Sequence, residues 1–205
     1  MEGSVDVPHL SYERIRVFAE QFLAAHHSSG TIPVPIEQIV EFKLHLDIVP
    51  LPGLEDAFSV VGFTSSDLRE ISVDQHVYEH QPGRYRFTLA HEVGHVVLHA
   101  GLFKAHRFRG IEAWKRFLKE LPELDYRWLE WQAYSFGGLV LVPAKALKRE
   151  TQEAAAQVKA QSINAEYDFA NALVIDMVAT RFDVSSEVIE RRLTYDKIDV
   201  TALLR

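Results

Sequence analysis

The sequence predicts an α+β fold in which a small sheet of three or more strands packs on a mainly helical body. Three short stretches rich in β-branched and aromatic residues lie between residues 46 and 73, and helical spacing of apolar residues dominates from residue 82 onward. Helices before and after one short run of strands are typical of the α+β class. A chain of 205 residues, 47% hydrophobic and 25% charged, is long enough to bury roughly 70% of its unfolded surface.

The expected elements begin with a helix from Ser11 to about His26, for which Ser11 is a suitable N-cap. Its apolar residues fall at i, i+3, i+4 and i+7 and are Ile15, Phe18, Ala19 and Phe22. Pro35 suits the first position of a short second helix. Strands are expected next, separated by Pro52-Gly53 and by the polar stretch 64–67. The strand ranges are 46–51, 58–63 and 70–73.

Helices are expected over most of the remaining chain. Pro122 and Pro143 mark boundaries between them, because proline interrupts the backbone hydrogen bonds of a helix. The expected ranges are 83–99, 111–120, 124–139, 144–160, 164–182 and 186–193.

Composition excludes several classes of function. The chain has no cysteine, so any metal must be held by His, Asp or Glu. The net charge of −7 argues against broad binding to nucleic acid or to anionic membranes. Met1–Leu10 has two acidic residues and no basic residue or apolar core, so we expect no signal peptide. No apolar run approaches the ~18 residues of a membrane span, and we expect a cytoplasmic protein without membrane contact.

The helix expected at 83–99 contains the motif His91-Glu92-Val93-Gly94-His95. Residues four apart lie above one another on a helix, so both imidazoles can reach one ion. Glu92 lies beside that ion, where its carboxylate can take a proton from a zinc-bound water. Zinc lowers the pKa of such a water to about 7, so a weak base is sufficient. The alternative interpretation is a core helix with two capping or polar histidines.

A catalytic zinc site usually takes three protein ligands, and the third is less clear from spacing. His99 lies about 12 Å along the helix axis from His91, so it cannot share the ion and is expected beside it or at the helix end. His106 lies in a basic stretch expected to be a solvated loop. Glu130, on the helix expected at 124–139, is the better candidate, although spacing alone also allows a surface acid. Small residues follow it, namely Ala133, Gly137 and Gly138, and they would let another helix approach closely.

Two stretches of this sequence resemble the ImmA/IrrE-type metallopeptidases. Residues 86–99 read RFTLAHEVGHVVLH, similar to the family pattern RFTLAHELGHxLLH. Residues 130–143 read EWQAYSFGGLVLVP, similar to E-x-x-A-x-x-F-A-A-x-L-L-M-P, with Gly137-Gly138 and Val142 as departures and Gln132 where relatives often have Glu. The resemblance spans roughly residues 10–145. It implies a zincin-like fold, Zn²⁺ held by His91, His95 and Glu130, and Glu92 as the catalytic base.

The resemblance also implies a function. The expected activity is a zinc-dependent endopeptidase that cuts a helix–turn–helix transcriptional repressor, with Glu92 as general base on the zinc-bound water. We expect extended substrate to pair with a sheet edge at Glu70–Asp74. The oxyanion-stabilising group stays open among the Tyr, His and Arg residues of 100–128.

The C-terminal part of the chain allows other functions. We expect a zincin-like metallopeptidase domain over residues 1–145 and a helical extension over 146–205 that packs on it. Residues 171–193 resemble a helix–turn–helix with Arg181, Arg191 and Arg192, although two packed helices are the preferred interpretation and direct DNA binding is not expected. The alternatives are therefore a non-catalytic metal-binding regulatory module and a DNA-binding regulator.

Overall fold

The computed structural model describes residues 7–106, 108, 110–161 and 167–205, and it has the predicted α+β architecture. Its strands are β1 (Asp47–Leu51), β2 (Gly62–Thr64) and β3 (Glu70–Asp74). The helices before the third strand are α1 (Tyr12–His26), α2 (Ile36–Phe42) and α3 (Leu54–Phe58). The helices after it are α4 (Gln75–His80), α5 (Pro82–Leu98), α6 (Ala100–His106), α7 (Gly110–Glu120), α8 (Glu123–Leu141), α9 (Ala144–Ala160), α10 (Tyr167–Phe182), α11 (Ser186–Asp196) and α12 (Val200–Leu204).

The three strands form one mixed sheet in the order β1-β3-β2. β1 runs parallel to β3, with Ile48 opposite Ile71, and β2 runs antiparallel to β3, with Phe63 opposite Ser72. β3 is therefore paired on both sides. The expectation that Glu70–Asp74 offers an open edge to substrate is wrong, because an apolar stretch does not reveal which strands lie outermost. The edges of the sheet are β1 and β2.

The stretch expected as a strand at 58–63 is also corrected. The chain forms the short helix α3 first, which begins after Gly53 (φ 66°) and ends at Ser59 (φ 56°). Both residues adopt the left-handed conformation that terminates regular structure. The strand is consequently shorter and later, at Gly62–Thr64. The helices α4, α6 and α12 were not expected either, and α6 occupies part of the stretch taken for a basic loop.

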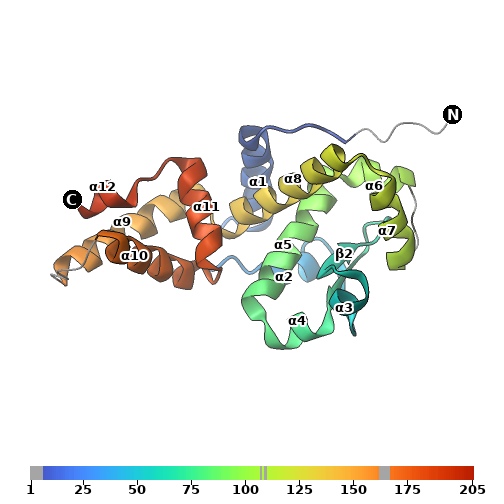
Figure 1. The fold of residues 1–205 in the computed structure, drawn as a ribbon, viewed down its shortest axis with the longest axis horizontal. Coiled ribbons are helices and arrows are strands. Elements are labelled where there is room, and N and C mark those ends of the chain that lie inside the picture. The colour runs from blue at the N-terminus through green and yellow to red at the C-terminus, as the bar shows by residue number, and fades with distance from the viewer. Residues whose placement is uncertain (1–6, 107, 109, 162–166) are drawn as a thin grey trace.

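Helices α5 and α8 form the centre of the molecule and touch through their backbones (Figure 1). A Cβ atom added to Gly94 would lie 2.9 Å from the Cα and carbonyl oxygen of Ala133. One added to Gly137 would lie 3.1 Å from the backbone nitrogen of His91. The prediction that Ala133 and Gly137 allow a close helix approach is confirmed. Gly138 has a different role, because a Cβ atom added there would lie 3.6 Å from Cδ of Arg192 and would meet no backbone.

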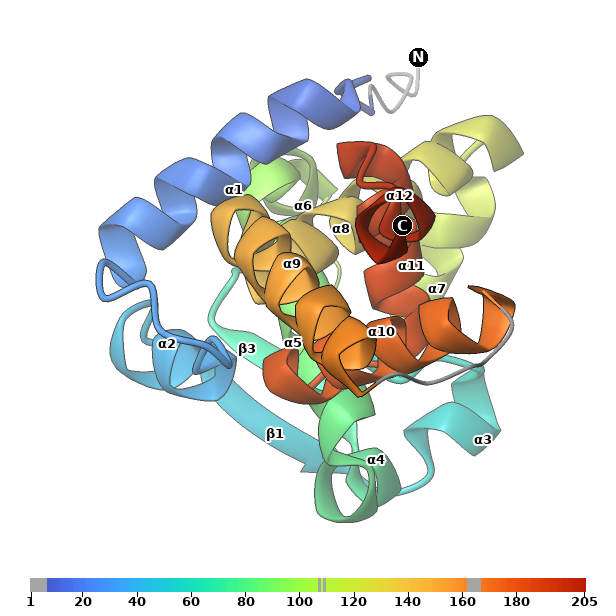
Figure 2. The same cartoon turned by 90° about the vertical axis from the view of Figure 1, so that its left-hand side faces the viewer.

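The helices α9 to α12 lie together at the end of the molecule away from the sheet, as Figures 1 and 2 show. Leu147, Val174 and Ile189 from these helices belong to the same buried cluster as Ile15 of α1 and Leu89 of α5. Of the helix expected at 164–182, residues 164–166 lie outside the described part of the chain. A division between residues 145 and 146 stays a prediction. Within the described residues, no helix has the length and hydropathy needed to cross a membrane.

Candidate metal centre

His91 and His95 point the same way from α5, as their spacing predicts. Their Nε2 atoms are 3.1 Å apart, and the ring of His95 is buried. Pro82 opens the helix at its first turn, and the buried residues Leu89 and Val93 hold its inner face in the core. The two imidazoles are thus carried by a helix whose first turn and inner face are both held in place.

Glu130 reaches the imidazole pair from α8. Its Oε2 atom lies 3.3 Å from His91 Nε2, and its Oε1 atom lies 3.7 Å from His95 Nε2. The close packing of Gly94 against Ala133 brings these two helices together just beside the carboxylate. The structure therefore gathers the three residues that the sequence singled out, although Glu130 lies 35 residues after His95.

The spacing and chemistry of these three side chains fit a metal ion. A tetrahedral zinc ion with bonds of about 2.0–2.1 Å would hold its ligand atoms about 3.3 Å apart, and the separations here are 3.1, 3.3 and 3.7 Å. Burial opposes a charge on His91, but the hydrogen bond and charge of Glu130, with the charge of Glu92, raise its pKa overall. Burial, assisted by His91 and His99, lowers the pKa of His95 well below its usual value. The cluster is able to hold a metal ion.

Glu92 lies beside the cluster and is only 4% exposed. The hydroxyl of Thr64, on β2, donates a 2.8 Å hydrogen bond to its Oε2 atom. Burial raises the pKa of Glu92 to about 7; His91 and the Thr64 hydrogen bond oppose the rise, and Glu130 adds to it. A raised pKa suits a group that accepts and returns a proton. Sequence patterns do not single out Thr64, because this contact joins residues 28 positions apart.

Gly62 explains how β2 can pass so close to α5. A Cβ atom at this position would lie 2.6 Å from Cγ2 of Thr88 and 3.5 Å from Oε1 of Glu92. Only glycine leaves the strand in contact with the helix here without displacing a side chain. The strand β2 and Glu92 are thereby held next to each other.

An open cavity of about 310 Å³ exposes the cluster and Glu92. A second cavity of about 370 Å³ adjoins it and shares Ser59, Val60 and Tyr126 as lining residues. Trp114 and Phe87 give the first cavity apolar walls, and the two cavities together form a groove that passes the metal cluster. Of the aromatic and basic side chains of 100–128, the structure places Tyr126 and Trp114 in the cavity that contains the cluster.

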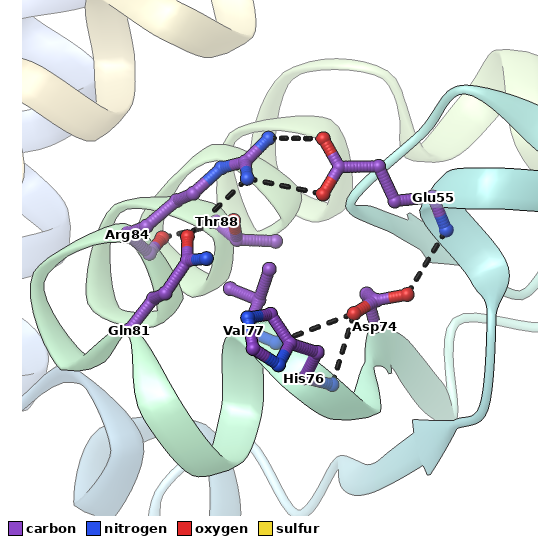
Figure 3. A network of polar contacts seen from close by, with 7 residues as sticks. All are labelled: Glu55, Asp74, His76, Val77, Gln81, Arg84 and Thr88. Carbon is purple, nitrogen blue, oxygen red and sulfur yellow. Dashed lines mark hydrogen bonds and ion pairs between the residues drawn. The ribbon is translucent and has the colours of Figure 1, made fainter.

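A network of polar contacts fixes the start of α5 beside this cavity (Figure 3). The carboxylate of Asp74 accepts hydrogen bonds from the backbone nitrogens of Glu55 and His76, at 3.0 and 2.9 Å. The guanidinium of Arg84 donates two hydrogen bonds to Glu55, at 3.0 and 2.6 Å. The network links α3, α4 and α5. Although Arg84 lines the cavity, Glu55 already holds its charged end.

The two histidines that were not favoured as ligands, His99 and His106, lie outside the cluster. His99 contacts the far side of His95, with their Nδ1 atoms 3.0 Å apart, and it is 1% exposed. Burial lowers the pKa of His99 to about 4, against opposing effects of Gln132 and Glu130. His106 is on α6, where its Nδ1 atom donates to the carbonyl oxygen of Leu102 and its ring packs on Phe117.

The fold and the three convergent side chains are those of a zincin-like domain. The chain belongs to the family described as the IrrE N-terminal-like domain (Peptidase_M78), which matches residues 76–194. The predicted resemblance to ImmA/IrrE-type proteins is thereby confirmed, and the matched residues include the whole cluster. This family suggests a metallopeptidase or a related regulator.

The comparisons with solved structures and with curated proteins are less informative about function than the family match. The chain is similar to a Mycobacterium tuberculosis transcriptional regulator, with 14% identity and a TM-score of 0.53. The match covers 90% of this chain and 52% of that one, so the chain spans about half the length of the regulator. At this identity the similarity shows the fold alone. No curated protein matches the chain.

Proposed function

We propose that the protein is a zinc-dependent endopeptidase in which His91, His95 and Glu130 hold the ion. The observation that carries this proposal is the arrival of the Glu130 carboxylate, from a separate helix, within 3.7 Å of both imidazoles. A structural histidine pair has no need of that carboxylate, whereas a catalytic zinc site needs a third ligand. The position of Glu92, adjacent to the cluster but outside it, supports the catalytic interpretation.

Glu92 would act as the general base in this peptidase. When bound, zinc supplies a Lewis acid that makes a water molecule more acidic and polarises the carbonyl group to be attacked. The Glu92 carboxylate would accept the proton of the attacking water and later return it to the leaving amine. Because Thr64 bonds to Oε2, that proton transfer is assigned to Oε1. The apolar walls of the cavity would keep bulk water away from the carboxylate.

The substrate peptide would lie in the groove, next to the outer edge of β2. Ser59, Val60 and Val61 lead into this strand and line the cavity beside the cluster. Main-chain hydrogen bonds to an edge strand hold an extended peptide without requiring a particular sequence. Tyr126 lines the same cavity one helical turn before Glu130, and its hydroxyl is the group we assign to the carbonyl oxygen of the scissile bond.

The substrate class is a protein, and we assign it to the helix–turn–helix repressors. The support is family membership, through the resemblance to ImmA/IrrE-type peptidases. The similar fold of a protein described as a transcriptional regulator is compatible with a role in gene regulation.

The test combines metal analysis with a cleavage assay on a repressor encoded beside the gene. The wild-type protein should bind about one zinc ion per chain and cut the repressor. Glu92→Gln should bind zinc equally well and cut at least about 100-fold more slowly, because general base catalysis contributes that much or more. Glu20→Gln, an exposed position on α1, serves as the control and should behave as wild type.

One result would contradict the role of Glu92, and another would contradict the peptidase. Cleavage by Glu92→Gln at the wild-type rate would remove Glu92 as the base. Zinc binding without cleavage by the wild-type protein would favour the alternative, a metal-binding regulatory module. A buried carboxylate with a raised pKa is costly to keep and gives such a module no advantage, which is why we favour the enzyme.

A further inference from the structure

The second cavity of the groove, next to the one that contains the metal cluster, has a positive charge of its own. Lys115 and Lys119 line it from α7, where they lie one turn apart. Within the described residues, neither lysine forms an ion pair. Because the chain as a whole carries a net charge of −7, two unpaired lysines beside the candidate active site are a local exception.

Away from the metal cluster and Glu92, the other charged side chains that line the groove are paired. Glu123 is the acidic residue among those lining the second cavity, and its Oε1 atom accepts a 2.6 Å hydrogen bond from Arg127, one turn further along α8. In the first cavity, both carboxylate oxygens of Glu55 hold Arg84. The groove therefore has unpaired positive charge in the second cavity, and the cation of the first cavity is already neutralised.

The path proposed for the substrate peptide passes both cavities. Ser59 and Val60 line both, and so does Tyr126, whose hydroxyl is assigned to the carbonyl oxygen of the scissile bond. An extended chain advances about 3.3 Å per residue, and its alternate side chains face the same way. A side chain that enters the second cavity therefore belongs to a residue within about three positions of the scissile bond.

Helix α7 holds the two lysines beside the groove. Its residues Trp114 and Phe117 are buried in the second core cluster, and the ring of Trp114 packs on Phe63 of β2 with centroids 5.9 Å apart. Figure 1 shows α7 next to β2 at one end of the molecule. The lysines are consequently carried by a helix that is packed against the substrate-binding strand.

We propose that the second cavity is a substrate subsite in which Lys115 and Lys119 select an acidic side chain close to the scissile bond. The proposal rests on the proposed function, because it concerns the peptide that this site would cut. When a peptide is added to a strand edge, main-chain hydrogen bonds provide affinity and side-chain pockets provide specificity. The apolar part of the lining, formed by Val60, Leu118 and Leu121, suits the methylene groups of a glutamate.

Binding to the Glu92→Gln variant in the presence of Zn²⁺ tests this subsite without cleavage. The probes are three fluorescein-labelled decapeptides of alanine and leucine that carry three successive glutamates, glutamines or lysines at their centre. Fluorescence anisotropy should show the glutamate peptide binding about 2- to 30-fold more tightly than the glutamine peptide, the size of two partly exposed ion pairs. Higher salt should reduce this preference, because salt screens charges near the surface. Equal binding of all three peptides, or no binding, would overturn the proposal.

Charge reversal separates selection by the two lysines from damage to the fold. Adding Lys115→Glu and Lys119→Glu to the same variant should make the lysine peptide the tightest of the three, a gain that misfolding cannot produce. The matched control is the pair Lys145→Glu and Lys148→Glu, both exposed on α9 at the other end of the molecule (Figure 1). It changes the net charge equally and should keep the preference for glutamate. Equal loss of the preference in both double variants would assign it to overall charge and contradict the subsite.

Cleavage of a mixture of proteome-derived peptides by the wild-type protein, with sites read by mass spectrometry, locates the selected residue. We expect glutamate and aspartate to be enriched at a position within three residues of the scissile bond, on one side only. Enrichment of leucine or phenylalanine there instead would assign the cavity to an apolar side chain and overturn the proposal. If the protein prefers the glutamate peptide but cuts nothing, the proposed function fails and the selection by charge stands. Cleavage without an acidic preference would mean the reverse.

Discussion

The assignment of Tyr126 as the oxyanion donor shows how the structure can narrow a choice that the sequence leaves open among many residues. Several Tyr, His and Arg side chains precede Glu130, and nothing in their spacing distinguishes them. In the structure Tyr126 lines both of the cavities that form the groove. Burial, together with the charge of the nearby Glu130, raises the pKa of its hydroxyl, which therefore stays protonated and able to donate. Arg84 also lines the cavity but is held by Glu55.

Tyr126→Phe should therefore lower kcat for peptide cleavage by about 10²- to 10³-fold, the usual cost of removing one oxyanion donor. KM and zinc content should change little, because the ring still fills the same wall of the cavity. Tyr78→Phe, an exposed position on α4, is the matched control. A Tyr126→Phe enzyme with wild-type kcat would show that another donor stabilises the oxyanion.

Among the elements, the contact between α5 and α8 decides whether the metal cluster can form. A Cβ atom at Gly94 would meet backbone atoms of Ala133 at 2.9 Å, and backbone cannot move aside as a flexible side chain can. Gly94→Ala should lower the free energy of unfolding by about 1–3 kcal/mol and weaken zinc binding, since Glu130 moves with α8. Gly138→Ala has ordinary contacts and should stabilise the helix by about 0.5–1 kcal/mol.

Urea unfolding and chelator competition on both glycine variants provide the measurement. Gly138 is in the same helix as Ala133. Comparison of the two variants therefore separates crowding where α5 and α8 cross from the general effect of replacing a glycine. Loss of zinc affinity in Gly138→Ala, or none in Gly94→Ala, would contradict the importance of this crossing.

Asp74 gives the start of α4 a dependence on pH. Its hydrogen bond from the backbone of Glu55, with those from His76 and Val77, lowers its pKa below the usual value, although burial works in the opposite direction. A carboxyl with a lowered folded pKa stabilises the protein above its unfolded pKa of about 3.9, and this contribution is lost as the pH falls further. Asp74→Asn should cost roughly 1–2 kcal/mol at pH 7.

The check is urea unfolding of wild type and Asp74→Asn between pH 7 and pH 3. The difference between them should be constant down to about pH 4 and then shrink, because the wild-type carboxylate becomes protonated. A difference that does not depend on pH over this range would mean that the charge of Asp74 contributes nothing.

The sequence pattern predicted the long helices but not the short ones. The helices α1, α5 and α9 contain several turns, so the spacing of apolar residues defined them closely. The helices α3, α4 and α12 have five or six residues, too few for a periodicity. Their starts depend on Gly53 in a left-handed conformation and on the side-chain caps Asp74 and Asp199. The order of the strands is set by contacts distant in sequence, and local pattern does not contain it.

In the candidate site, too, local sequence pattern predicts some residues, and contacts between distant positions determine the others. His91, Glu92 and His95 follow from one motif, and Glu130 followed from its spacing and the family resemblance. Thr64 could not be assigned in this way. Its contact with Glu92 joins residues 28 positions apart. The motif therefore predicted the candidate residues, and the fold was needed to find the side chain that holds the Glu92 carboxyl in place.

Across the whole molecule, α11 joins the group of C-terminal helices to the end of α8. The three arginines of the stretch that resembles a helix–turn–helix form ion pairs: Arg181 with Glu150, Arg191 with Glu187 and Arg192 with Asp196. Arg192 is 3% exposed and also donates hydrogen bonds to the carbonyl oxygens of Gly138 and Val142, at the end of α8. Arg181 joins α10 to α9 and Arg192 joins α11 to the end of α8, whereas the Arg191 pair lies within α11. Two of the three arginines are thus engaged between helices, which suits two packed helices better than a DNA-binding surface.

Arg192→Met should therefore lower the free energy of unfolding by about 3–5 kcal/mol, because it leaves Asp196 and two carbonyl groups buried without this partner. Arg191→Met, the adjacent exposed pair, should cost at most about 1 kcal/mol. Urea unfolding compares the two variants, and limited proteolysis should cut Arg192→Met first between α9 and α11. Since α8 also carries Glu130, the same variant should bind zinc more weakly. Equal stability of the two variants would mean that α11 does not hold the end of α8, and that the C-terminal helices are independent of the metal site.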